Sequence, residues 1–109
     1  MNSQPANIMT VSQFTRRIKG LIEVQLGYVW VSGEISNWRV SPAGHAYFTL
    51  KDKDSQVDAV MFRGRLGNVR FDPDNGLEVI VHGPVSVYEK RGNYQIICEE
   101  MQPKGMGEL

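Results

Sequence analysis

Aromatic and basic side chains gather around one predicted turn, where together they could hold a flat, negatively charged ligand. The turn has the sequence SPAG at residues 41–44. The residues beside it are Trp38, Arg39, His45, Tyr47 and Lys51. Flat rings can stack on nucleobases, each stack contributing roughly 1–3 kcal/mol, and cations can pair with phosphates. This stretch therefore predicts contacts with a single-stranded nucleic acid.

Further basic residues occur at two other places in the chain. Lys90 and Arg91 lie in a second predicted turn, EKRG at residues 89–92. Arg63 ends the apolar run QVDAVMFR, residues 56–63, and Arg65 follows directly after that run. Cations at a hairpin tip are usually only solvated. Since the chain has twelve basic and twelve acidic residues, any site for a polyanion must be a local patch.

Trp38 has two possible roles. The apolar residues Val29, Val31 and Ile35 alternate along one predicted strand, and Trp38 is out of phase with them. That phase favours an exposed ring that stacks on a base. The alternative is a ring that packs over the hydrophobic core of the domain. Tyr47 could likewise be an ordinary cross-strand residue, and the convergence of these groups on one face favours binding.

The residues that could catalyse a reaction form no recognisable site. Asp52, Asp54 and Asp58 lie close together in DKDSQVD, where aspartates are expected to form a turn. Two histidines and one cysteine make no triad, and His82 within an apolar run is expected to be structural. We expect no catalytic residue, no metal site and no cofactor.

Composition narrows the class of protein. A chain of 109 residues with 41% hydrophobic residues fits one domain with one core. Cys98 is the single cysteine, so no internal disulfide can form. The apolar runs are too short to cross a bilayer, and the N-terminus has no signal pattern. A cytoplasmic protein without membrane contact is expected.

Periodicity predicts one helix followed by five strands. Thr10 and Gln13 have capping-box spacing, and apolar residues then recur at helical intervals to about Gln25. Five extended segments follow, and Gly33 and Gly83 interrupt the longest of them, as the corners of a small closed sheet require. The predicted strands cover residues 28–40, 45–51, 56–63, 77–88 and 93–102.

These elements predict a mainly β fold, namely a five-stranded OB-fold barrel with an N-terminal amphipathic helix. A sandwich usually needs about seven strands. Residues 1–9 are expected to be flexible, and residues 10–109 to form the single-stranded nucleic-acid-binding domain. OB folds bind across strands 2 and 3, between the loop joining strands 1 and 2 and the loop joining strands 4 and 5. The turns at 41–44 and 89–92 fall in those two loops.

Three motifs carry a resemblance to a known family. GEISN (33–37), GHAYFTLKD (44–52) and VMFRG (60–64), in this order and behind the helix VSQFTRRIKGLIE (11–23), resemble the N-terminal domain of exodeoxyribonuclease VII large subunits. The resemblance extends from about Thr10 to Leu109.

The resemblance implies a role in DNA breakdown. Enzymes of that family are bacterial and cytoplasmic, and they hydrolyse single-stranded DNA to oligonucleotides. A large subunit pairs with several small subunits, which attach to regions absent from this sequence. The barrel is the DNA-binding part, while the nuclease centre lies in a following domain, so this chain alone is expected not to cut DNA. An anticodon-binding barrel of a class II aminoacyl-tRNA synthetase and a barrel used only for protein assembly are the alternatives.

Overall fold

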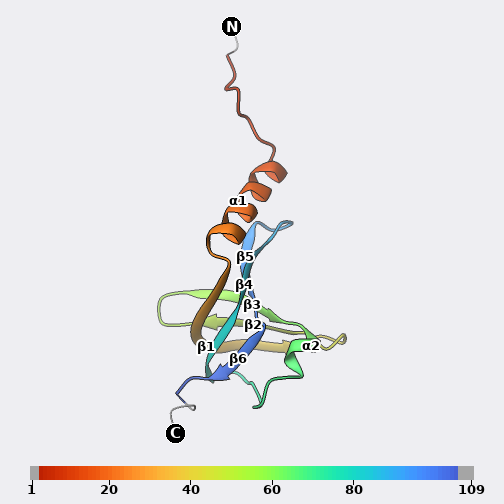
Figure 1. Ribbon diagram of the computed structural model, residues 1–109, viewed down its shortest axis with the longest axis vertical. Coiled ribbons are helices and arrows are strands. Elements are labelled where there is room, and N and C mark those ends of the chain that lie inside the picture. Colours follow the sequence, from red (N-terminus) through yellow and green to blue (C-terminus); the bar gives the residue numbers. More distant parts are fainter. Residues whose placement is uncertain (1–2, 106–109) are drawn as a thin grey trace.

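An amphipathic helix precedes the sheet and projects from it (Figure 1). Helix α1 (Val11–Gln25) begins at a capping box, in which the Thr10 hydroxyl accepts from the Gln13 amide at 3.1 Å and the Gln13 side chain accepts from the Thr10 amide at 2.9 Å. It ends before Gly27, whose φ of 56° suits glycine. This computed structural model describes residues 3–105, and no residue of α1 is buried. The prediction of this helix and its cap is confirmed.

Five strands close into a ring, which confirms the predicted OB barrel. Around the ring the order is β1-β2-β3-β5-β4, and β4 pairs with β1 to close it. All neighbours are antiparallel except β3 and β5, which are parallel. The short helix α2 (Arg63–Leu66) follows β3. The strands are β1 (Tyr28–Val40), β2 (Ala46–Lys51), β3 (Gln56–Met61), β4 (Glu78–Tyr88), β5 (Asn93–Ile97) and β6 (Glu100–Pro103).

The last predicted strand, 93–102, is divided into β5 and β6. Both pieces pair with β4, β5 with Val85–Tyr88 and β6 with residues 79–82. The chain crosses over Gly83 between them, and a Cβ on Gly83 would collide with the Ile97 carbonyl oxygen. The Glu99 amide then donates to the His82 carbonyl at 2.7 Å. Gly83 thus permits the close approach of the crossing chain, whereas the pairing of β1 with β4 runs through it in regular register.

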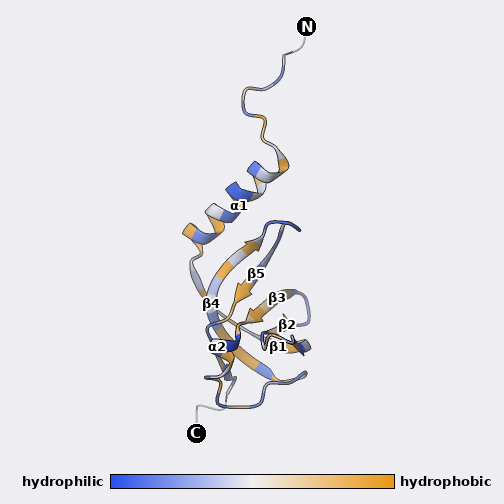
Figure 2. Ribbon diagram, turned by 90° about the vertical axis from the view of Figure 1, so that its right-hand side faces the viewer, coloured by the Kyte–Doolittle hydropathy of each residue, from blue (hydrophilic) through white to orange (hydrophobic). Residues whose placement is uncertain are grey.

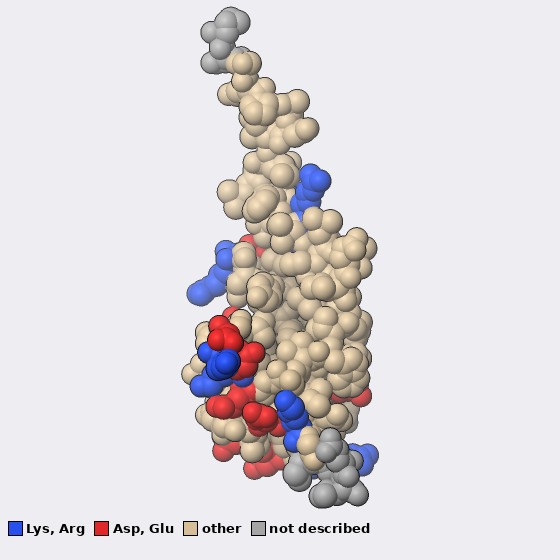
Figure 3. Space-filling model, turned by 90° about the vertical axis from the view of Figure 1, so that its left-hand side faces the viewer, with Lys and Arg blue, Asp and Glu red and all other residues tan. Residues whose placement is uncertain are grey.

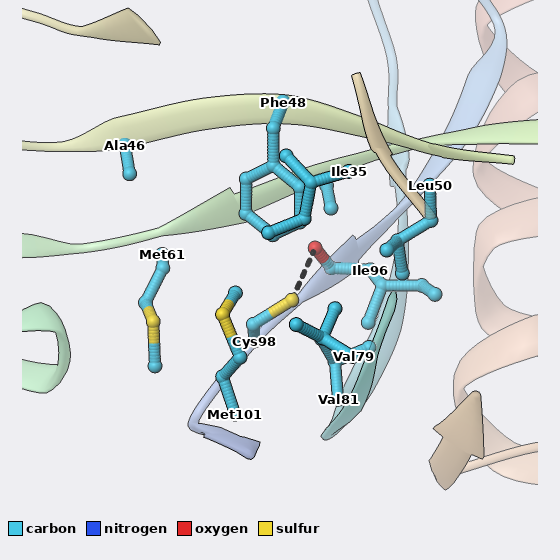
Figure 4. Close-up of a cluster of buried hydrophobic side chains, with 11 residues drawn as sticks. Ile35, Ala46, Phe48, Leu50, Met61, Val79, Val81, Ile96, Cys98 and Met101 are labelled. Carbon is cyan, nitrogen blue, oxygen red and sulfur yellow. Dashed lines mark hydrogen bonds between the residues drawn. The ribbon is translucent and has the colours of Figure 1, made fainter. Parts of the chain in front are cut away.

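The core fills the ring with side chains from alternating strand positions (Figure 4). Figure 2 shows hydrophobic residues along the strands of the barrel. In β4 the side chains of Val79, Val81, Val85 and Val87 are all buried. Phe48 and Leu50 point inward from β2. The other members of the central cluster are Ile35, Ala46, Ala59, Met61, Ile96, Cys98 and Met101.

A β-bulge near the end of β1 changes which side chains point inward. The pairing with β2 shifts between Ser36 and Arg39, and Asn37 has a φ of 55°. Asparagine tolerates this left-handed conformation better than most residues. Strict alternation is broken at this point, so a residue's face cannot be extrapolated from Val31 and Ile35 to the end of the strand.

Two expectations concern the ends of the chain. Residues 1 and 2 of the segment expected to be flexible, and residues 106–109 of the expected domain, lie outside the described residues. Residues 3–9 form no helix or strand. Within residues 3–105, no helix is both long and apolar enough to cross a membrane.

Candidate nucleic-acid interface

A groove of about 430 Å³ crosses β2 and β3 between the end of β1 and the 89–92 hairpin. Strands β2, β3 and β5 supply its floor, and the end of β1 and the 89–92 hairpin supply its sides. Its lining includes three rings and two cations. They are Tyr47, Phe62, Tyr88, Arg39 and Arg91.

Arg39 and Tyr47 form the wall on the β1 side. The two residues are register partners, and the Arg39 guanidinium carbon lies 5.4 Å from the centre of the Tyr47 ring. This cation–π contact holds a positive charge beside a half-buried aromatic ring. A base stacked on the ring would therefore have a phosphate-binding group next to it.

His45 and Arg63 hold the nearby loop in place. The Arg63 amide donates to His45 Nδ1 at 3.0 Å. The His45 ring meets the Phe62 ring edge-on, with centroids 5.2 Å apart. Gly44, at a φ of 91°, leaves space that the Arg63 side chain fills, since a Cβ there would lie 2.8 Å from Arg63 Cδ. The loop is thus fastened to the end of β3.

The 89–92 hairpin places two cations at the opposite rim. The Arg91 and Gly92 amides both donate to the Tyr88 carbonyl, at 3.1 and 2.8 Å. Arg91 lines the groove, and Lys90 is exposed beside it on the same turn. An ion pair between Glu89 and Lys19 of α1, at 3.4 Å, braces this hairpin.

Two aromatic residues of the groove were missed from the sequence. Phe62 and Tyr88 are 43% and 45% exposed, and both line the groove. Phe62 follows Asp58 and Val60 at alternate positions, so period-two spacing places it on the same face. Tyr88 follows the buried Val87, which turns its ring outward. Both signals were present in the sequence.

Two predicted cations are not brought to the groove. Lys51 lies 3.9 Å from Glu34, and Arg65 lies 3.7 Å from Glu99. Both line other pockets of the barrel. The face in Figure 3 likewise shows acidic and basic side chains intermixed over the lower part of the barrel. The local basic patch therefore reduces to Arg39, Arg63, Lys90 and Arg91.

Trp38 packs against the core. Its half-buried ring contacts the central cluster, with its centroid 5.2 Å from that of Phe48, and it does not line the groove. The bulge at Asn37 explains this orientation, and the alternation argument for an exposed ring is wrong. Trp38 therefore has the packing role that the sequence analysis gave as the alternative.

Comparison with known proteins identifies the family. Residues 9–102 match the family model described as the OB-fold nucleic acid binding domain. The chain belongs to this family. It is also 46% identical over all 109 residues to the exodeoxyribonuclease 7 large subunit of Shewanella frigidimarina, of which it spans 24%.

Solved structures share the fold of this OB-fold domain. A replication protein A heterotrimer bound to ssDNA has a TM-score of 0.58 at 14% identity, covering 71% of this chain and 57% of that one. The S. pombe Stn1-Ten1 complex has 0.56 at 14%, covering 73% and 60%. Asparaginyl-tRNA synthetase from Pyrococcus horikoshii has 0.54 at 16%, covering 71% and 19%. At these identities the likeness shows the fold alone.

A second pocket of the OB-fold domain, of about 570 Å³, includes Trp30, Arg65 and Glu100 in its lining. The Trp30 ring stacks on His82 with centroids 4.1 Å apart, and His82 Nδ1 lies 2.9 Å from a Glu100 oxygen. His82 therefore has partners on two sides, as expected of a structural histidine. A hydrogen bond to Glu99 raises the pKa of the Tyr28 hydroxyl nearby.

Cys98 lies in the core of the OB-fold domain. Burial raises the pKa of its thiol to about 12, so the thiolate needed for a nucleophile or a metal ligand does not form near neutral pH. Within residues 3–105, no three histidine, cysteine or acidic side chains are grouped so that they could hold a metal ion.

The three aspartates are placed differently from what the sequence suggested. The Asp52 side chain accepts from the amides of Asp54 and Ser55, both at 2.9 Å, so a turn forms there as predicted. Asp58 instead lies within β3 and lines the groove. The strand predicted from residue 56 already contained Asp58, so grouping it with the turn aspartates is wrong.

Proposed function

We propose that this OB-fold domain binds single-stranded DNA along the groove across β2 and β3. The observation that carries the proposal is the meeting of three rings with cations from the end of β1 and from the 89–92 hairpin. Tyr47, Phe62 and Tyr88 offer faces on which unpaired bases can stack, and Arg39 and Arg91 lie where phosphates would pass. In a duplex the bases are already stacked on one another, so these rings favour single strands.

The local charge is suited to a strand whose bases face the sheet. The chain as a whole has no net charge, so attraction depends on the four cations near the groove. These cations come from the loops and strand ends at the rim, whereas the centre of the floor carries Asp58. Phosphates are therefore held at the rim and bases at the floor.

The proposed setting is the large subunit of an exodeoxyribonuclease VII. The S. frigidimarina relative bears that name, and this chain spans about a quarter of its length. In this setting the barrel holds the strand while a nuclease centre elsewhere in the large subunit cuts it, and small subunits attach to other regions. The reduced, buried Cys98 fits a cytoplasmic enzyme.

RNA is the competing ligand. The similarity of fold to asparaginyl-tRNA synthetase makes it the specific alternative, since that enzyme acts on an RNA. The titrations should therefore include a DNA 12-mer of mixed sequence, its RNA counterpart and the DNA duplex. We expect the single DNA strand to bind at least about tenfold more tightly than the duplex.

A pair of tyrosine variants tests whether the groove is the site. Tyr47 lines the groove, whereas Tyr94 is 56% exposed and lines a different pocket. Tyr47→Ala should weaken single-strand binding by about 1–3 kcal/mol, the value of one stacked base, and Tyr94→Ala should leave it unchanged. Equal binding of duplex and single strand, or equal effects of the two variants, would contradict the proposal.

A further inference from the structure

The floor of the groove carries a carboxylate, although the proposed ligand is a polyanion. Asp58 is exposed in β3, and Thr49 on β2 and Gln95 on β5 are its register partners. All three line the groove. A phosphate at this point would be repelled, so Asp58 should meet the edge of a base.

Asn93 orients the carboxylate. Its side-chain amide donates from Nδ2 to an Asp58 oxygen at 3.3 Å. Asn93 Oδ1 is buried and has no hydrogen-bond partner among residues 3–105. The amide cannot be reversed without turning its oxygen toward the carboxylate. Asn93 thus holds the exposed carboxylate of Asp58, which presents its remaining acceptor positions at the centre of the floor.

A ligand with N–H groups complements these acceptor positions. A carboxylate can accept two hydrogen bonds in parallel. The Watson–Crick edge of guanine offers two adjacent donors, N1–H and N2–H. Thymine offers one donor, N3–H, between two carbonyl oxygens that a carboxylate repels. Cytosine offers an amino group beside an acceptor nitrogen and falls between the two.

We propose that Asp58, held by Asn93, gives the groove a preference for guanine over thymine. This inference rests on the proposed binding of single-stranded DNA in the groove. Stacking on Tyr47, Phe62 and Tyr88 does not distinguish sequences. The Asp58 carboxylate does distinguish bases, because it accepts hydrogen bonds from the edge of a stacked base.

Three strands of equal length and charge test the preference: dT12, d(TC)6 and d(TG)6. The wild-type chain should bind d(TG)6 about five- to tenfold more tightly than dT12, with d(TC)6 between them, which is the lower part of the range for one good base contact. Asp58→Asn should bind dT12 more tightly, because a negative charge that repels the thymine carbonyls is lost, and d(TG)6 should not gain to the same extent, because the contact to guanine is weakened. Its ratio between d(TG)6 and dT12 should fall below about twofold.

Asp54→Asn is the matched control, since it removes the same charge from the β2–β3 turn, outside the groove. It should keep the wild-type ratio. Thermal melting confirms that both variants are folded. Equal binding of the three strands by the wild type, or an unchanged ratio in Asp58→Asn, would overturn the role of Asp58 and leave the proposed function intact. Failure to bind any strand would instead overturn the proposed function.

Discussion

Replacing Trp38 with alanine separates packing from binding, because the structure places this ring against Phe48 and outside the groove. A large aromatic side chain buries about 150 Å² or more. At about 25 cal/mol per Å², that burial contributes roughly 4 kcal/mol. Some of this surface is already hidden in the unfolded chain, which lowers the value by roughly 10–40%. Trp38→Ala should therefore cost about 3 kcal/mol of folding free energy.

Thermal melting and fluorescence titration measure the two effects in the same variant. A loss of about 3 kcal/mol lowers the melting temperature of a domain of this size by roughly 12–24 °C. The affinity of the folded fraction for a DNA 12-mer should stay within about twofold of wild type, since the groove keeps its rings and cations. The bond from the Trp38 amide to Asn75, at 2.9 Å, is retained because it involves the backbone.

Trp30→Ala is the control with the same chemical change. Trp30 is 61% exposed and stacks on His82 at the surface, so its loss should cost only about 1 kcal/mol. The opposite pattern for Trp38→Ala, with an unchanged melting temperature and binding weakened tenfold or more, would refute the packing role and make Trp38 a stacking residue.

Two further predictions concern the wild-type chain. A plot of the logarithm of the affinity for single-stranded DNA against the logarithm of the salt concentration should have a slope of about −3. Each phosphate contact releases roughly 0.7 counterions, and four cations are available to make such contacts, namely Arg39, Arg63, Lys90 and Arg91. A flat response would show that these cations do not touch phosphates. Labelled single-stranded DNA should remain intact with and without magnesium, because the acidic residues within 3–105 form no group able to hold a metal ion, and metal-dependent shortening of the strand would contradict this.

Helix, strands and barrel were predictable because each has a local signal. The capping box and the alternation in β2 and β4 both act within a few residues. The bulge at Asn37 has no such signal, since many sequences could host it. One inserted residue was enough to turn the Trp38 ring toward the core.

The site was predictable only in part, because partners distant in sequence decide what each charge does. Lys51 and Arg65 are of the same residue types as the groove cations. In the fold, however, Glu34 lies beside Lys51 and Glu99 lies beside Arg65. Only the folded barrel brings these residues together. Asp58 shows the same limit. Its place in a strand was predicted, but only the pairing of β3 with β2 and β5 puts its carboxylate on the floor of the groove.

Helix α1 and the barrel differ in how their backbone hydrogen bonds are protected. The helix has fifteen residues and buries none of them, and its Val11 and Val24 side chains are 81% and 79% exposed. An isolated helix of this length is marginal in water. Its amides can therefore exchange with solvent through local unwinding, whereas the amides between β1 and β4 become free only when the ring opens. We therefore expect the amides of α1 to exchange before those of the ring, although α1 contacts β4 and is tied to the barrel by the Lys19–Glu89 ion pair.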